Sequence, residues 1–157
     1  MLTPIMAMFQ PKERNYTSWN FINSDDTQVN VDIDPVKEKL LVGDIVENSH
    51  VKRVSKYRTM NNIPGVLVYD GNTYGRYSGK FLYKCVPNDK QLPTFLVPYS
   101  PKGTPGFGKT KTNKFVLFKF ATWEEKHPIG SLTNTLGDVS ELSVYYNYRL
   151  FCNDIHV

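Results

Sequence analysis

The sequence predicts an all-β protein. Short segments that alternate apolar and polar residues dominate the chain, and they are rich in Val, Tyr, Phe and Thr. Clusters of Gly, Pro, Asn and Asp separate these segments, which is typical of small barrels and sandwiches. The segments expected to form strands are 16–22, 27–33, 51–57, 64–71, 74–86, 94–99 and 113–123.

Three stretches depart from this pattern. Residues 34–41 predict a single helical turn, and residues 99–113, in which Pro, Gly and Lys alternate, predict a long, mobile basic loop between two strands. A C-terminal α-helix is expected over residues 139–153, where Asp138 and Glu141 have the spacing of an N-terminal capping pair. Its apolar residues recur at helical spacing, at Val139, Leu142, Tyr146 and Leu150.

Positive charge is concentrated in the middle of the chain. Residues 50–120 contain 13 Lys or Arg and two acids, a net charge of +11, whereas the whole protein carries only +4. The same segment is rich in Tyr and Phe. Cations that neutralise phosphates, interleaved with rings on which bases stack, indicate a surface for single-stranded nucleic acid. A solvated basic face built on ordinary strand residues is the alternative.

Composition excludes several classes of protein. A chain of 157 residues with 40% hydrophobic residues is large enough for one medium or two small cores. Cys85 and Cys152 have no metal-ligand spacing and are expected to be reduced thiols. The opening segment lacks the basic region of a signal peptide, and no apolar run reaches membrane-spanning length. We therefore expect a cytoplasmic, intracellular protein with no membrane partner.

Residues 103–110 match the phosphate-loop pattern GxxxxGK[ST] letter for letter. A phosphate loop requires a helix directly after it, so that backbone N–H groups face the phosphates. Residues 113–123 alternate as a strand instead. We therefore expect no nucleotide binding.

The chain contains little other chemistry. His50, His127 and His156 are scattered, and no Ser, His and acid set has a catalytic spacing. No converging carboxylates would bind a metal for hydrolysis. We expect no catalytic residue, no metal ligand and no small-molecule cofactor.

Several runs resemble a known family. They are LVGDIV at 41–46, HVKRVSKYRT at 50–59, IPGVLV at 63–68 and, most specifically, FLYKCVPNDKQLPTFLV at 81–97. FKFATW, HPIG and LGD follow in order up to residue 138. Together they resemble the N-terminal cold-shock region of the RNase II and RNase R (RNB) exoribonuclease family, in its exosome-type and large-DNA-virus branch. YYNYRLFC at 145–152 is most similar to the viral proteins.

The resemblance spans residues 40–152 and implies a fold and a function. It implies two tandem small OB-fold (cold-shock-like) barrels, the first abbreviated, over residues 12–59 and 60–138. Residues 1–11 would be a tail, and residues 139–157 a helix that leads to a catalytic domain encoded downstream. In this family the catalytic domain holds magnesium on an aspartate cluster, which this chain lacks. The chain is therefore expected to bind and thread single-stranded RNA for a 3′–5′ exoribonuclease and to be inactive alone, in the host cytoplasm if viral.

The candidate RNA-binding residues follow from charge and rings together. For Arg53 or Arg58 the alternative role is an ion pair across barrels with Asp44 or Glu47. For Tyr74 and Tyr77 the alternative role is packing. The candidates are Arg53, Lys56, Arg58, Tyr74, Arg76, Tyr77, Lys80, Lys84, Lys109, Lys111 and Lys114. The alternative function is a protein–protein interaction module built on a degenerate barrel pair.

Overall fold

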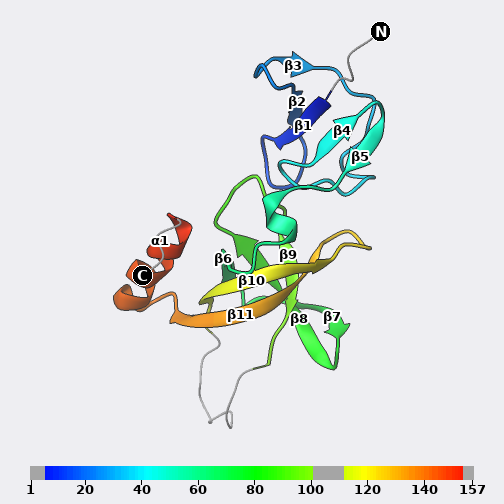
Figure 1. The fold of residues 1–157 in the computed structure, drawn as a ribbon. Coiled ribbons are helices and arrows are strands. Elements are labelled where there is room, and N and C mark those ends of the chain that lie inside the picture. Colours follow the sequence, from blue (N-terminus) through cyan, green and yellow to red (C-terminus); the bar gives the residue numbers. More distant parts are fainter. Residues whose placement is uncertain (1–5, 101–111, 154–157) are drawn as a thin grey trace. The chain divides into compact units, whose positions relative to one another are not determined.

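The computed structural model describes residues 6–100 and 112–153, which form eleven strands, one short 3₁₀ helix and one α-helix (Figure 1). They are β1 (Met6–Pro11), β2 (Trp19–Ile22), β3 (Gln28–Val29), β4 (Ile45–Glu47), β5 (His50–Lys52), η1 (Lys56–Arg58), β6 (Ile63–Leu67), β7 (Thr73–Tyr77), β8 (Lys80–Pro87), β9 (Phe95–Pro98), β10 (Lys114–Thr122), β11 (Ile129–Asp138) and α1 (Leu142–Cys152).

The chain divides into two compact units. The first consists of residues 1–59 together with residues 89–93, and the second of residues 60–88 and 94–157. The division after residue 59 coincides with the boundary that the sequence predicts between two barrels. The inclusion of residues 89–93 in the first unit was not predicted.

The first unit is an open antiparallel sheet of short strands in the order β3-β2-β1-β4-β5. Its core is built around Phe9, whose ring lies 5.1 Å from that of Tyr16 and 5.5 Å from that of Phe21. Leu40 and Leu41, which lie in the loop between β3 and β4, are also fully buried. An open five-stranded sheet of this kind is consistent with an OB fold.

Strand β1 lies within the segment that the sequence predicts as a tail. Met6–Pro11 alternates exposed and buried positions, with Ala7 and Phe9 buried, and it pairs with both β2 and β4. The alternation is that of a half-buried strand. It is short and ends in Pro11, so its alternation alone predicts a strand only weakly.

Residues 89–93 complete the first unit. Leu92 is fully buried, and its carbonyl accepts a hydrogen bond from the Arg14 guanidinium at 3.1 Å. The hydroxyl of Tyr57 donates to the carboxylate of Asp89, and the side-chain amide of Gln91 donates to the Pro11 carbonyl at 3.2 Å. These contacts join sequence positions 32 to 80 residues apart.

The second unit contains a closed five-stranded barrel. Its ladder runs β6-β10-β11-β9-β8, and an additional pairing of β8 with β6 closes the ring. Phe95 and Phe118 meet at 4.9 Å between ring centroids in its core, with Ile63, Leu67 and Val116 also buried. The all-β fold class with OB-type barrels and a C-terminal helix is therefore confirmed.

Two inward-facing glycines permit the tight packing of this core. A Cβ atom at Gly65 or at Gly130 would lie 2.9 Å from the Phe118 ring. Real Cβ atoms do not approach so closely, so these positions require glycine. The barrel wall is thereby brought against the two phenylalanine rings.

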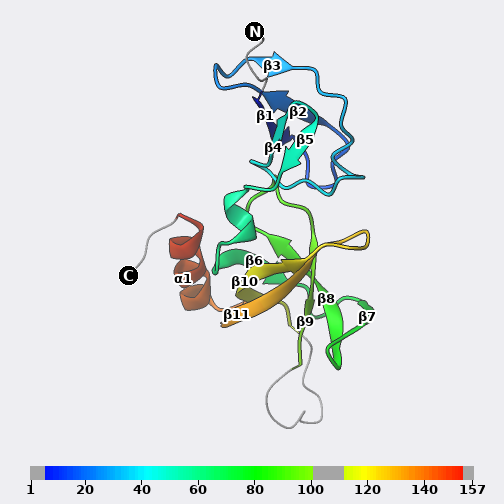
Figure 2. The ribbon, with the colours of Figure 1, turned by 45° about the vertical axis from the view of Figure 1, so that its right-hand side comes forward.

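The C-terminal helix differs from the prediction in its cap and in its packed face. The expected Asp138–Glu141 capping pair is not formed, because Glu141 makes no capping bond and Asp138 accepts from Lys114 instead. Leu142 and the other periodic apolar residues are exposed, whereas Tyr148 is buried and stacks on Phe115 at 4.3 Å. Figure 2 shows the helix beside the barrel of the second unit, which it contacts through the buried Tyr148.

Two further predictions concern the chain between β9 and β10 and the chain before β4. The phosphate-loop pattern at 103–110 lies outside the described residues, but the segment after it is strand β10, as predicted. Residues 35–39 form turns rather than a helix. There the Asp34 carboxylate accepts from the backbone N–H of Val36 at 3.0 Å.

Candidate nucleic-acid interface

A hairpin made of β7 and β8 carries five of the predicted RNA-binding residues. Ser78 and Gly79 join the strands, and both have positive φ angles, which is the geometry that a two-residue hairpin turn requires. All of β7 is exposed. Residues 73–87 contain no Asp or Glu. The five residues that it brings together are Tyr74, Arg76, Tyr77, Lys80 and Lys84.

Cations and rings lie against one another on this hairpin. The Lys84 ammonium lies 5.3 Å from the ring centroid of Tyr74, and the Arg76 guanidinium lies 4.4 Å from that of Phe81. Such pairs contribute about 0.5–1 kcal/mol each at exposed sites. Tyr74 and Phe81 nevertheless remain about 40% exposed. The rings are therefore held in place and still offer surface for stacking.

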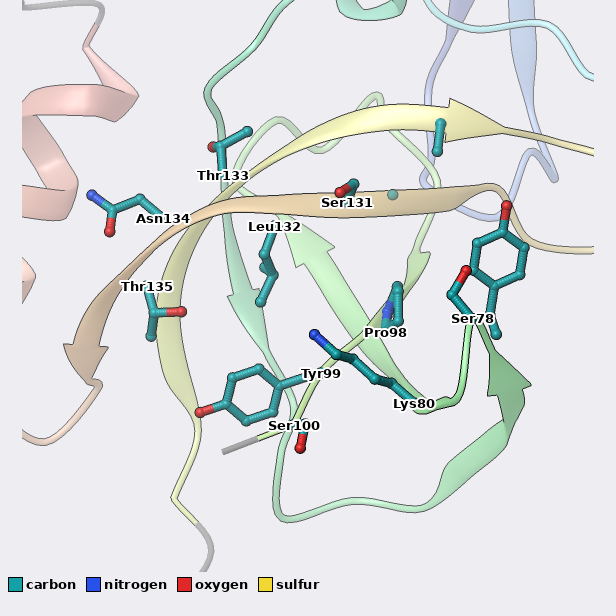
Figure 3. Close-up of a pocket in the computed structure, with 13 residues that line it drawn as sticks. Ser78, Lys80, Pro98, Tyr99, Ser100, Ser131, Leu132, Thr133, Asn134 and Thr135 are labelled. Carbon is teal, nitrogen blue, oxygen red and sulfur yellow. The ribbon is translucent and has the colours of Figure 1, made fainter. Parts of the chain in front are cut away.

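A groove of about 880 Å³ opens beside the hairpin turn (Figure 3). Hydroxyl, phenol and amide side chains dominate its lining, and Lys80 is the only charged residue among the described residues that line it. Figure 3 shows the Lys80 ammonium directed into the groove, near Tyr99 and Leu132. The lining residues are Tyr77, Ser78, Lys80, Pro98, Tyr99, Ser100, Ala121, Gly130, Ser131, Leu132, Thr133, Asn134 and Thr135.

The groove lies where two parallel strands part. Strand β11 pairs with β10 along its length, but its described pairing with β9 is limited to Ile129 opposite Leu96. Gly130 then turns inward against Phe118 and Phe95. Beyond that point β9 and the start of β8 form one wall and β11 the other. In OB folds the second and third strands and the adjoining loops bind oligonucleotides, and β8 and β9 occupy those places here.

Tyr99 links the groove to a cluster of rings. Its ring centroid lies 5.1 Å from that of Tyr69 and 6.2 Å from that of Tyr83. Burial raises the pKa of Tyr99, and the nearby Lys114 partly opposes that rise. The phenol is therefore a neutral hydrogen-bonding group at physiological pH.

Lys114, a predicted RNA-binding residue, is already paired. Its ammonium donates to the Asp138 carboxylate, and this hydrogen bond is the main reason that the pKa of Asp138 is lowered. The pair is only partly exposed. Lys114 thus brings little net charge to the Tyr99 end of the groove. Lys109 and Lys111, the other candidates of this region, lie outside the described residues.

The three predicted cations of the first unit have different surroundings. Arg58 forms a buried ion pair with Asp44, which is the alternative role that the sequence predicts for it. Both residues belong to the first unit, so the ion pair does not join two barrels. Arg53 donates to the Glu38 carbonyl at 2.7 Å. Lys56 is exposed and lies 5.2 Å from the Tyr57 ring centroid.

Sequence reasoning missed the wall of the groove that β11 provides. Ser131, Thr133 and Thr135 lie in a strand with few of the Val, Tyr and Phe residues by which the other strands were recognised. Tyr99 lies in the aromatic-rich segment 50–120 but is not among the predicted site residues. The sequence pattern that could have indicated β11 is its run of Ser, Thr and Asn residues. That composition is equally typical of a loop.

The described residues contain neither a metal centre nor a membrane span. Within residues 6–100 and 112–153, no group of three or more His, Cys, Asp or Glu side chains is placed to hold a metal ion. The helix in this part of the chain is too short to cross a membrane.

Barrel closure, the cationic hairpin and the groove define the second unit as an OB fold of the cold-shock type. Residues 82–153 match the family model described as Dis3-like cold-shock domain 2 (CSD2). No curated protein sequence matches the chain significantly.

The solved structures that are similar to this chain include the following two. Yeast Ssd1, a pseudonuclease, aligns with a TM-score of 0.64 at 14% identity over 94% of this chain. The apo form of Mycoplasma genitalium RNase R aligns with a TM-score of 0.51 at 16% identity over 96%. The chain corresponds to 24% of each of those proteins. The predicted resemblance to the cold-shock/OB region of the RNB family is confirmed, and assignment to the viral branch stays a prediction.

Proposed function

We propose that this chain binds single-stranded RNA through the β7–β8 hairpin and the adjoining groove, and guides it to the catalytic domain of an RNB-family 3′–5′ exoribonuclease. One observation carries the proposal. Exposed rings, unopposed cations and a groove lined by hydrogen-bonding side chains meet at one place in an OB barrel. Both likenesses and the family match agree with such a role.

The chemistry divides between the hairpin and the groove. Arg76, Lys80 and Lys84 neutralise phosphates, which supplies affinity without sequence preference. Tyr74 and Tyr77 offer ring faces on which bases stack, at about 1–3 kcal/mol per base. The chain therefore binds and positions RNA, and the hydrolytic step belongs to the catalytic domain.

The test is a salt titration of RNA binding by fluorescence anisotropy, with a labelled single-stranded RNA and the 157-residue protein. In the variant with Lys80→Ala and Lys84→Ala, the slope of log affinity against log salt becomes shallower by about 1.4 units, at about 0.7 per phosphate contact. The charge-matched control replaces Lys12 and Lys37, two exposed lysines of the first unit, and leaves the slope unchanged. A slope that is the same in both variants contradicts the proposal.

Stacking has a different signature in the same titration. Tyr77→Ala weakens binding by about 1–3 kcal/mol at every salt concentration and leaves the slope unchanged, because no charge is removed. Tyr77 is 43% exposed and has no ring partner among the described residues, so its loss leaves the barrel core intact. Wild-type affinity in this variant would exclude stacking at this position.

A protein interaction module is the second candidate function, and α1 favours it. The helix and Val139, three residues before its start, expose five large apolar side chains, at Val139, Leu142, Tyr145, Tyr146 and Leu150. Binding of a protein partner depends less steeply on salt than release of counterions from RNA does. Absence of RNA binding at low salt would favour this second function.

A further inference from the structure

The hydroxyl groups of β11 differ in whether they are already hydrogen-bonded. Thr133 donates through Oγ1 to the Asn62 side chain at 3.0 Å. The Ser131 and Thr135 side chains line the groove and have no hydrogen-bond partner within the described parts of the chain. In Figure 3 the Thr135 hydroxyl is directed toward the side of the groove that holds Lys80 and Tyr99, whereas Thr133 points away from them.

The cations of the hairpin cannot distinguish RNA from DNA. Both polymers present the same phosphates, so Arg76, Lys80 and Lys84 attract both alike. The ribose 2′-hydroxyl, which both donates and accepts a hydrogen bond, is the group that allows a protein to tell them apart at a given position. A protein group that donates or accepts a hydrogen bond at that position can therefore discriminate between the two polymers. A threonine or serine hydroxyl can do either.

The groove is better suited to a sugar than to a phosphate. Among its described lining residues there is one cation and no acid, and the rest are hydroxyl, phenol, amide or apolar. Leu132 extends into the groove between β11 and Tyr99 (Figure 3). A nucleoside placed there would have an apolar floor, polar walls and its phosphates toward Lys80.

We propose that Thr135 contacts a ribose 2′-hydroxyl of bound RNA and that Ser131, four residues away on β11, contacts that of another nucleotide, so that β11 makes this barrel prefer RNA to DNA. The inference rests on the proposed function, since it concerns the same groove. It adds the residues that determine which polymer is retained. Thr133 is the internal control, because it lies two positions away on the same strand and its hydroxyl is already bonded to Asn62.

The experiment compares oligouridylate with oligodeoxyuridylate of equal length, which differ only in the 2′-hydroxyl. One net hydrogen bond corresponds to roughly a 2- to 12-fold change in affinity, and the wild-type protein is expected to prefer the RNA by at least that ratio. Thr135→Val reduces the ratio toward one by weakening RNA binding alone. Ser131→Ala reduces it in part, and Thr133→Val leaves it unchanged.

Each outcome has a separate meaning. Equal binding of the two polymers by the wild-type protein overturns the inference and leaves the proposed function standing, whereas absence of binding to both overturns the two together. An unchanged ratio in Thr135→Val also overturns the inference. If that variant does not fold, a scan of single deoxyuridines through the RNA decides the question with the wild-type protein. A scan in which no position costs affinity refutes the inference.

Discussion

Arg58→Ala is predicted to destabilise the first unit because it breaks a buried ion pair. Asp44 is fully buried and accepts the backbone N–H groups of Leu41 at 2.8 Å and Ser55 at 2.9 Å. The Arg58 guanidinium supplies the remaining bonds, from Nε at 3.0 Å and from a second nitrogen. Removing the guanidinium leaves a buried carboxylate without its counter-charge.

The size of the effect follows from what remains around that carboxylate. Breaking a buried pair from one side costs about 3–5 kcal/mol, because the other charge stays desolvated. Two backbone donors persist at Asp44, and the Arg58 side chain was itself 14% exposed, so water can reach its vacated position. Both facts place the expected loss near the lower limit, at about 3 kcal/mol.

The assay is urea unfolding followed by tryptophan fluorescence. Trp19 lies in β2 of the first unit and Trp123 follows β10 in the second, so a Trp123→Phe background makes Trp19 the reporter of the first unit. Lys56→Ala, an exposed change in the same short helix, is the control and stays within about 0.5 kcal/mol of wild type. The reasoning is refuted if Arg58→Ala is equally silent. A shallower salt slope for RNA in that variant would instead support the role that the sequence suggested.

Two further variants test the barrel. Gly130→Ala is expected to cost about 1–3 kcal/mol in urea unfolding, because its Cβ would lie 2.9 Å from the Phe118 ring and 3.3 Å from the Phe95 ring. A neutral effect would contradict the inferred packing. Asp138→Asn tests the ion pair with Lys114, which lowers the pKa of Asp138 in the folded state. A carboxyl whose pKa is lowered by folding stabilises the fold when the pH is above its unfolded-state pKa, and this contribution is lost as the pH falls. The stability difference between wild type and variant should therefore be present at pH 7 and shrink below about pH 4. A difference independent of pH would exclude this linkage.

The fold class and the main cationic element could be predicted from the sequence because both depend on local patterns. Tyr74 and Lys84 fall within the alternating segment 74–86, which predicts a single strand, whereas the structure divides this segment into β7 and β8 at the turn of Ser78 and Gly79. The family-like runs on either side then define the type of barrel. Strand β11 could not be found in this way, since its Ser, Thr and Asn residues carry no such alternation.

The pairing of charges could not be read from the sequence. Arg58 and Lys114 belong to the same basic segment as Lys80, yet each meets one acid contributed from another part of its unit. Asp44 and Asp138 are 14 and 24 residues away from their partners. Charge counting along a chain therefore overestimates the cationic surface, because the partners are determined by strand registry.

Residues 89–93 are synthesised after much of the second unit, although they belong to the first. Leu92 is buried in the first unit, and Asp89 accepts a hydrogen bond from Tyr57 of the same unit. In the sequence, however, both residues come after β6, β7 and β8 of the second unit. Nascent chains that have passed residue 59 thus hold all the strands of the first sheet without the segment that completes its packing. A fragment ending there would expose the apolar surface that Leu92 covers. A fragment that is expressed to study the first unit should therefore extend beyond residue 93.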